Sequence, residues 1–186
     1  ASPQRNPGGV LVPQTEKGLT GKGFEVLAEM ERMHMIVDVS HLSDKGFWDI
    51  VEHGTRPFAA SHSNCRALAP HTRNLTDEMI RALSERGGIA GLNYYAPFLD
   101  TDPTHPENCR STVELIAKHA AHYKQVGGAQ MIALGSDFDG IDGPHQLENA
   151  AFLPLLADAL RKEGFTEDEV EGIYYRNAMR FFEENL

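Results

Sequence analysis

Val-Asp-Val-Ser-His (residues 37–41) and Phe-Ala-Ala-Ser-His (residues 58–62) are two short apolar runs that each end in a serine and a histidine. A third run, Ile-Ala-Leu-Gly-Ser-Asp (residues 132–137), ends in a carboxylate. Runs of this length and apolarity predict buried parallel strands. Imidazoles and a carboxylate at the C-terminal ends of successive strands are what a metal-hydrolase site in a β/α barrel needs, because rigid strands aim the ligands while the following loops vary.

The size and composition of the chain predict a globular domain with a real core. It has 186 residues and a formal net charge of −10, from 27 acidic against 17 basic side chains. This balance argues against nucleic acid or an anionic membrane as the main partner. Two cysteines are too few for a disulfide framework or a thiolate zinc cluster. No apolar run approaches the length of a membrane span, and the N-terminus lacks a signal-peptide pattern, so we expect a cytoplasmic location.

Helical and strand patterns alternate along most of the chain. Residues 1–19 are rich in Gly, Pro and polar side chains and predict a loop or linker, with the domain at 20–186. We expect helices at 21–34, 44–53, 77–86 and 112–126, each leading to a strand, at 35–40, 57–61, 88–94 and 131–136. This order predicts an α/β fold with right-handed crossovers. Four such units are about half of the eight in a closed (β/α)8 barrel of roughly 250 residues, so either further units lie elsewhere or half-barrels pair.

Local signals mark where the helices begin and end. An apolar residue before a hydroxyl N-cap and another at the fourth helical position form a hydrophobic staple at Leu19-Thr20 with Phe24, Leu42-Ser43 with Phe47, Leu75-Thr76 with Ile80, and Phe165-Thr166 with Val170. Capping boxes are predicted for Ser111 with Glu114 and for Thr166 with Glu169. Gly87 and Gly164 suit helix C-termini, and Pro154 suits the first turn of a helix that runs to about residue 163.

His41 and His62 are the candidate metal ligands, because neutral imidazole binds zinc well and adjacent strand ends share one face. Either histidine alone is more often a polar loop residue. Asp137 is the candidate site carboxylate, which could bind a cation, a substrate amine or the proton of a metal-bound water. Arg73, in the loop that leaves the second histidine strand, could clamp a substrate carboxylate with two parallel hydrogen bonds. A solvated loop arginine is about equally compatible with the sequence.

Other polar residues favour structural interpretations. Asp139-Gly140 is a good turn signal, and Asp139 is expected to bond to the backbone. His119 and His122 have the spacing of a helical metal pair, but their helix lacks a carboxylate in register, so a solvated or interhelical role is favoured. His71, beside Arg73, has no clear assignment.

In order, these residues resemble the membrane dipeptidase (renal dipeptidase) family of zinc metallopeptidases. The resemblance runs from Gly18-Leu19-Thr20 to the C-terminal helix. It is carried by Met35-Ile36-Val37-Asp38-Val39-Ser40-His41, Ser61-His62-Ser63-Asn64, Arg73-Asn74-Leu75-Thr76 and Gly135-Ser136-Asp137-Phe138-Asp139-Gly140. The combination is specific, although no single motif is. The resemblance implies a (β/α)8 TIM-type barrel with two zinc ions bridged by a glutamate, of which this chain supplies about four C-terminal units, and hydrolysis of dipeptides by metal-activated water.

Carried over by position, the resemblance implies that His41 and His62 bind the second zinc ion. It implies that Arg73 holds the substrate carboxylate, and that Asp137 binds the free amine and takes part in proton transfer. The family's His-x-Asp pair, bridging glutamate and further histidine precede Gly18 in family members and have no equivalent here. We therefore expect these residues alone to be inactive, and expect a dipeptide substrate with a homodimer or a missing N-terminal half as partner.

Two other interpretations stay open at this point. One is another barrel metal hydrolase acting on lactones, phosphoesters or amines, although Arg73 favours a substrate that bears a carboxylate. The other is a non-catalytic half-barrel that serves as a binding or assembly module.

Overall fold

The computed structural model describes residues 4–5, 11–12, 17–101, 105–143 and 145–186. Its strands are β1 (Gln4–Arg5), β2 (Leu11–Val12), β3 (Ala59–Ala60), β4 (Ile89–Leu92) and β5 (Ile132–Leu134). Its α-helices are α1 (Gly21–Arg32), α2 (Asp44–His53), α3 (Asp77–Glu85), α4 (Ala96–Leu99), α5 (Val113–Gly127), α6 (Leu153–Lys162), α7 (Glu167–Glu171) and α8 (Asn177–Asn185). Short 3-10 turns lie at Pro106–Asn108, Ala129–Met131 and Ala150–Phe152, and a π-helical turn at Gly172–Arg176 joins α7 to α8.

The sheet that organises the fold is parallel, with the order β3-β4-β5. This confirms the α/β class. The predicted strand at 35–40 is reduced to a single parallel bridge between Asp38 and Ala59. The backbone bonds Ala59 N to Val37 O (2.9 Å) and Val39 N to Ala59 O (2.8 Å) still hold this segment against β3. Its extended conformation ends early because the chain turns at once, with Leu42 N bonded to Val39 O.

The N-terminal part of the chain carries a second, separate pair of strands. β1 and β2 are antiparallel, with Gln4 opposite Val12 and Arg5 opposite Leu11. The loop or linker predicted at 1–19 otherwise lies largely outside the described residues.

The helix-start predictions are confirmed at four hydroxyl caps. The side chains of Thr20, Ser43, Thr76 and Thr166 each accept a bond from the backbone N–H three residues later, and Glu169 completes the capping box of Thr166. Gly87 and Gly164 end their helices with positive φ values of 73° and 84°. The cap predicted at Ser111 is wrong by one residue. Thr112 caps α5, because the backbone of Ser111 is engaged in a bridge with His145.

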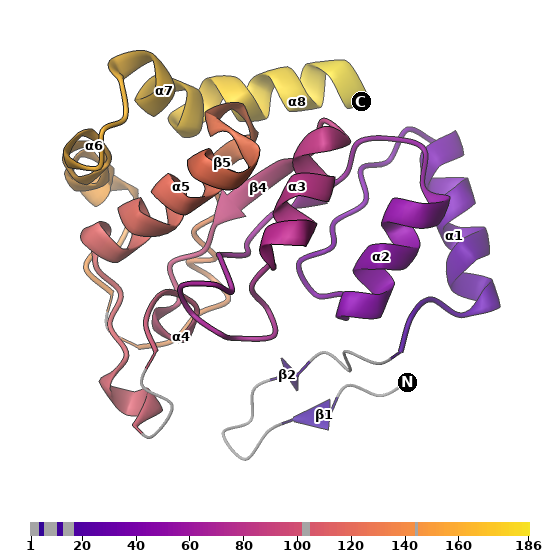
Figure 1. The fold of residues 1–186 in the computed structure, drawn as a ribbon, viewed down its shortest axis with the longest axis horizontal. Helices are drawn as coiled ribbons and strands as arrows, with labels where there is room; N and C mark the ends of the chain where they lie inside the picture. Colours follow the sequence, from indigo (N-terminus) through magenta and orange to yellow (C-terminus); the bar gives the residue numbers. More distant parts are fainter. Residues whose placement is uncertain (1–3, 6–10, 13–16, 102–104, 144) are drawn as a thin grey trace.

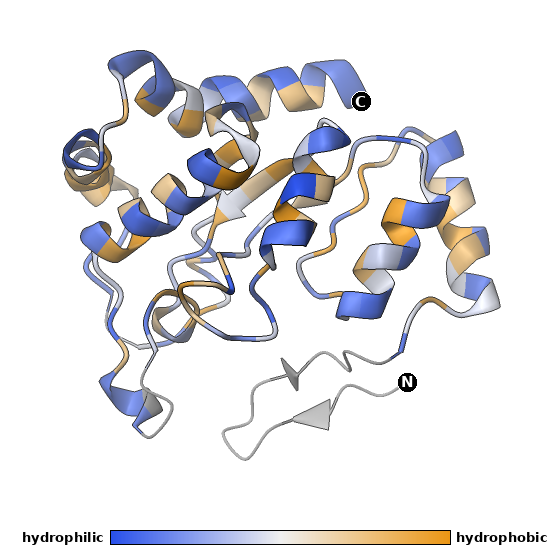
Figure 2. Ribbon diagram, in the orientation of Figure 1, coloured by the Kyte–Doolittle hydropathy of each residue, from blue (hydrophilic) through white to orange (hydrophobic). Residues whose placement is uncertain are grey.

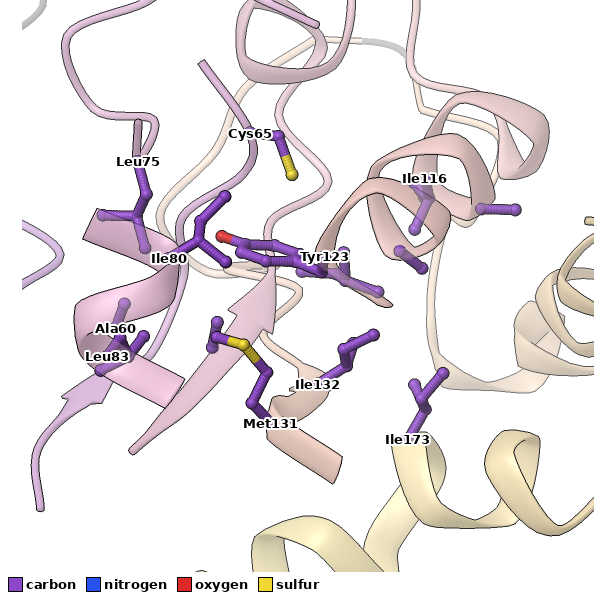
Figure 3. Packing of buried hydrophobic residues seen from close by; sticks show 14 of the residues in the cluster. Ala60, Cys65, Leu75, Ile80, Leu83, Ile116, Tyr123, Met131, Ile132 and Ile173 are labelled. Carbon is purple, nitrogen blue, oxygen red and sulfur yellow. The ribbon is translucent and has the colours of Figure 1, made fainter. Parts of the chain in front are cut away.

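One face of the sheet forms the main core with α3 and α5. Ala60, Leu92 and Ile132 point into this layer and are fully buried. Tyr123 of α5 lies among Ile80, Ile116 and Met131 (Figure 3), and its hydroxyl donates to the carbonyl of Ser63 at 2.8 Å. Figure 2 shows hydrophilic residues on the outer turns of α3 and α5 and hydrophobic ones at the start of β4. The core thus anchors the loop that follows His62.

The other face of the sheet is covered near the strand starts by α8. Ala59, Ile89 and Ala133 pack there against Phe181. Arg56, just before β3, also donates to the carbonyl of Asn185 at 2.8 Å. Figure 1 shows α8 across this end of the sheet and α4 at the opposite end. The predicted site residues therefore lie in the loops that follow the C-terminal ends of the strands. In the described part of the chain no helix combines the length and apolarity needed to cross a membrane.

Candidate metal and substrate site

The two histidines at the strand ends face each other. The Nε2 atoms of His41 and His62 are 2.8 Å apart, and the ring centroids are separated by 4.8 Å. The parallel pairing of Val37–Val39 with β3 explains this proximity, because each segment carries its histidine just beyond the paired residues. Both imidazoles thus present the same ring nitrogen to one point.

Asp38 cross-links the two strand ends beneath the histidines. Its Oδ1 accepts from the backbone N–H groups of Ser40 (3.1 Å) and Ser61 (2.9 Å), and its Oδ2 accepts from the Ser61 hydroxyl (2.5 Å). Burial alone would raise the pKa of Asp38, but the bonds from Ser61 and Ser40 outweigh it and lower the pKa. Asp38 is therefore an ionised acceptor.

The hydroxyl of Ser61 sets the tautomer of His62. Ser61 Oγ lies 2.7 Å from His62 Nδ1, and its own proton is given to the Asp38 carboxylate. Ser61 must then accept a bond from Nδ1–H, since Asp38 has no proton to offer. The proton of a neutral His62 thus sits on Nδ1, and Nε2 keeps its lone pair toward His41. A partner that fixes the other ring nitrogen in this way is typical of metal-binding histidines.

Burial favours the neutral form of both rings. Burial lowers the pKa of His41, and the positive charge of Arg73 lowers it further. Burial also lowers the pKa of His62, against the opposing effect of the Asp137 carboxylate. A neutral imidazole is the form that binds a metal ion.

The donor set fits part of a zinc site. Two nitrogens that share a tetrahedral zinc ion at about 2.0–2.1 Å lie roughly 3.3 Å apart, so a small rotation of one ring accommodates the ion. Within the described ranges, no three His, Cys, Asp or Glu side chains are grouped so that they could hold a metal. Two imidazoles are one fewer than the three protein ligands that a catalytic zinc site usually has.

Arg73 reaches the same rim from the loop after β3. Its Nε donates to the carbonyl of Ser40 at 2.6 Å, and its guanidinium carbon lies 5.2 Å from the centre of the Phe98 ring. The side chain is buried, and Nη2 has no hydrogen-bond partner among the described residues. Burial lowers the pKa of Arg73, while the carboxylates of Asp137 and Asp38 oppose the shift. A buried guanidinium with an unused donor is suited to bind a carboxylate.

Asp137 follows β5 in a strained conformation. Its φ of 63° lies in the left-handed region, which a non-glycine residue adopts at a cost and often at functional sites. Gly140 permits this turn, because a Cβ there would collide with the Asp137 carboxylate. Asn93 donates to Asp137 Oδ2 at 3.1 Å. The Asp137 carboxylate raises the pKa values of His41, His62 and Arg73 through its charge. The four groups are therefore close enough to interact electrostatically.

The remaining polar candidates have structural contacts. His122 bonds to Asp77 at 2.7 Å and joins α5 to α3, which confirms an interhelical role. His119 is buried, accepts from Cys65 N–H and bonds to the carbonyl of Leu99. Asp139 lies exposed in the turn after Asp137.

Sequence reasoning missed three contributors to the site, namely Asp38, Ser61 and Asn93. His71, left unassigned, accepts from Arg73 N–H at 3.1 Å and lies against Phe98. Position was a signal for two of these residues, because Ser61 directly precedes His62 and Asn93 directly follows β4.

A sequence profile described as membrane dipeptidase (peptidase family M19) matches residues 4–185. The chain belongs to the membrane dipeptidase family. An uncharacterized protein from the pqqA 5' region of Klebsiella pneumoniae is 38% identical over 168 residues, which are 90% of this chain and 61% of that protein. The dipeptidase tcpJ of Claviceps purpurea is 33% identical over 168 residues, 90% of this chain and 38% of that protein.

Solved structures of this family are also similar. A metallopeptidase from Rhodobacter sphaeroides, liganded with a phosphinate mimic of the dipeptide L-Ala-D-Ala, has a TM-score of 0.85 and 32% identity, over 94% of this chain and 49% of that one. A family M19 metallopeptidase named dipeptidase AC has a TM-score of 0.83 and 33% identity, over 94% of this chain and 51% of that one. The chain thus spans about half the length of these relatives.

Proposed function

We propose that the protein containing these residues is a zinc-dependent dipeptidase, and that residues 20–186 are the C-terminal part of its barrel domain. The observation that carries this proposal is the convergence of two neutral imidazoles, a buried guanidinium with an unused donor, and a carboxylate at one rim of a parallel sheet. Hydrolysis of lactones, phosphoesters or simple amines would leave one of these groups without a role, since such substrates give Arg73 no carboxylate to bind.

The fold that supports this function is an arc of a (β/α)8 barrel. The strands are parallel, α3 and α5 pack on one face, and the candidate residues follow the C-terminal strand ends, where barrel enzymes place their sites. The edges at Val37–Val39 and β5 are where neighbouring barrel strands would pair.

His41 and His62 would hold one zinc ion, and the rest of its ligands are not among the described residues. A zinc ion supplies Lewis-acid polarisation of the scissile carbonyl and makes the attacking water more acidic. Asp38 and Ser61 keep the His62 lone pair aimed at the ion.

Two side chains of opposite charge, Arg73 and Asp137, recognise the substrate. Arg73 binds the C-terminal carboxylate of the dipeptide, because its guanidinium is charged, buried and short of a partner. Asp137 binds the free ammonium group and can accept a proton during hydrolysis. A substrate with both charges at its ends is thereby oriented with its single peptide bond between them, which favours dipeptides over longer or blocked peptides.

The test compares free and N-acetylated dipeptides with the complete protein, after zinc is quantified by elemental analysis. We expect bound zinc, hydrolysis of the free dipeptide and little hydrolysis of the acetylated one, because acetylation removes the charge that Asp137 binds. Fewer than one zinc ion per chain would favour a non-catalytic module, and equal rates on both substrates would remove the proposed role of Asp137.

A further inference from the structure

Asn93 is a fully buried residue directly after β4, and both ends of its side-chain amide are hydrogen-bonded. Its Nδ2 donates to Asp137 Oδ2 at 3.1 Å and lies 3.5 Å from the carbonyl of His62. Its Oδ1 accepts from the Tyr95 backbone N–H at 2.6 Å. The amide therefore has one available orientation, with its donors toward Asp137.

A second buried asparagine fixes the backbone of Asn93. Asn64 accepts from Asn93 N–H at 3.0 Å and donates to the Asn93 carbonyl at 2.9 Å. Such a two-sided contact replaces the bonds of a strand neighbour just where the ladder between β3 and β4 has ended. Asn93 is thus held by the segment that carries His62.

A third buried asparagine extends the network to the arginine loop. Asn74 accepts from Asn64 N–H at 3.1 Å and donates to the carbonyl of Phe98 at 2.9 Å. Asn74 follows Arg73 in the chain, and the Phe98 ring lies beneath the Arg73 guanidinium. The three asparagines therefore form one rigid connection between the loop of Arg73 and the carboxylate of Asp137. Buried amides that satisfy one another in this way hold a single arrangement, because any rearrangement leaves a polar group unpaired.

The Asp137 carboxylate needs such a support. It lies in a turn with a left-handed backbone, and its Oδ1 has no hydrogen-bond partner among the described residues, whereas Oδ2 is held by Asn93. Asn93 therefore fixes one oxygen, while the other lies over Gly140 of the same turn without a hydrogen bond to hold it. Without the bond from Asn93, the side chain is free to adopt other rotamers.

We propose that Asn93 is a positioning residue that aims the Asp137 carboxylate at the amino group of the substrate, and that the Asn64–Asn74–Asn93 network sets the separation between Asp137 and Arg73. This inference rests on the proposed function, because it assumes that Asp137 binds the substrate amine. It adds that recognition of the amine depends on a residue that does not touch the substrate.

The test uses Asn93→Ala and Asn93→Leu in the complete protein. Asn93→Leu keeps the approximate size of the side chain but removes the donor to Asp137 and the acceptor for Tyr95 N–H. The probes are a phosphinate dipeptide mimic with a free amine and its N-acetyl derivative, and the measured quantity is the inhibition constant of each. We expect binding of the free-amine probe to weaken about tenfold in both variants, the loss typical of a hydrogen bond to a charged group. The acetylated probe should change less than about twofold.

Asn177→Leu is the matched control. The Asn177 amide donates to two backbone carbonyls, those of Ala129 (2.9 Å) and Ile132 (2.8 Å), next to the start of β5 and away from Asp137. This variant should lower the melting temperature and leave the ratio of the two inhibition constants unchanged. A fold defect is thereby separated from a positioning effect.

Three results would overturn the proposal. Equal weakening of both probes in the Asn93 variants would indicate a merely structural role, and unchanged binding of the free-amine probe would show that Asp137 needs no support. Asp137→Asn separates this inference from the function on which it rests. If Asp137→Asn weakens only the free-amine probe while the Asn93 variants do not, only the positioning role is lost. If it changes neither probe, both proposals fail.

Discussion

Asp38 and His62 are joined through one hydroxyl group: Ser61 Oγ lies 2.5 Å from Asp38 Oδ2 and 2.7 Å from His62 Nδ1. The same carboxylate accepts from the backbone of Ser40, next to His41. A single carboxylate thus sets the tautomer of one histidine and fixes the strand ends that carry both. In the proposed metal site, Asp38 would therefore affect metal affinity without being a ligand.

Ser61→Ala is expected to weaken zinc binding by the complete protein about tenfold, within the range typical for loss of a residue that orients a ligand. The variant removes the acceptor for His62 Nδ1–H, so the ring can take the other tautomer and lose the lone pair on Nε2. Chelator competition measures the affinity. Ser84→Ala is the control. The Ser84 hydroxyl donates to an oxygen far along the chain, the carbonyl of Gly127 at the end of α5, and not to a residue of the proposed metal site. Equal zinc affinities for the Ser61 variant and the wild type would contradict the proposed role of Ser61 in orienting His62.

Arg73→Lys is expected to lower kcat/KM for a free dipeptide by about 10- to 100-fold, mainly through KM. Lysine keeps the charge but cannot donate to Ser40 O and to a substrate carboxylate with the same planar group. Steady-state kinetics on the complete protein measures the effect. Arg161→Lys serves as control, because the Arg161 guanidinium on α6 is engaged by the Glu167 carboxylate at 2.6 and 2.9 Å. A similar rise in KM for both variants would argue against a carboxylate site at Arg73.

Elements specified by neighbouring residues were predictable from the sequence. α2 occupies the predicted range, Asp44–His53, because its cap, its staple and its apolar spacing are all local. The convergence of His41 and His62 followed from a general property of parallel sheets, whose C-terminal strand ends meet at one edge.

Features that depend on register between distant segments were not predictable. Asn93 meets Asp137 across a separation of 44 residues, and Asp38 meets Ser61 across 23. Nothing local to these residues distinguishes them from other polar residues at strand ends. The N-cap of α5 moved from Ser111 to Thr112 for the same reason, because a bridge to His145 outcompeted the local signal.

The 186-residue polypeptide alone is expected to hydrolyse no dipeptide, even with added zinc. Two imidazoles are fewer than the three protein ligands that a catalytic zinc usually needs, and residues 1–17 contain no histidine. Assays on this polypeptide and on the complete protein under the same zinc concentration check this. If the polypeptide hydrolysed dipeptides at a rate within about tenfold of the complete protein, the argument that it has too few zinc ligands for catalysis would be wrong.

The buried His119 is expected to make folding stability dependent on pH. Burial lowers its pKa from 6.5 to about 4 in the folded chain. The unfolded chain therefore binds the proton more readily, so the stability from a neutral His119 is complete above pH 6.5 and is lost as the pH falls toward 4. The loss over this window is about 3 kcal/mol, since one pKa unit corresponds to about 1.4 kcal/mol. Urea unfolding at several pH values measures it.

His119→Gln isolates this contribution. Glutamine can still donate to the carbonyl of Leu99 but has no proton to gain, so the free energy of unfolding should fall less steeply between pH 6.5 and 4 than in the wild type. His71, whose pKa is also lowered to about 4 by burial, keeps part of the slope in both proteins. If His119→Gln keeps the full slope, water or a compensating charge must reach His119, and its burial would not control its ionisation.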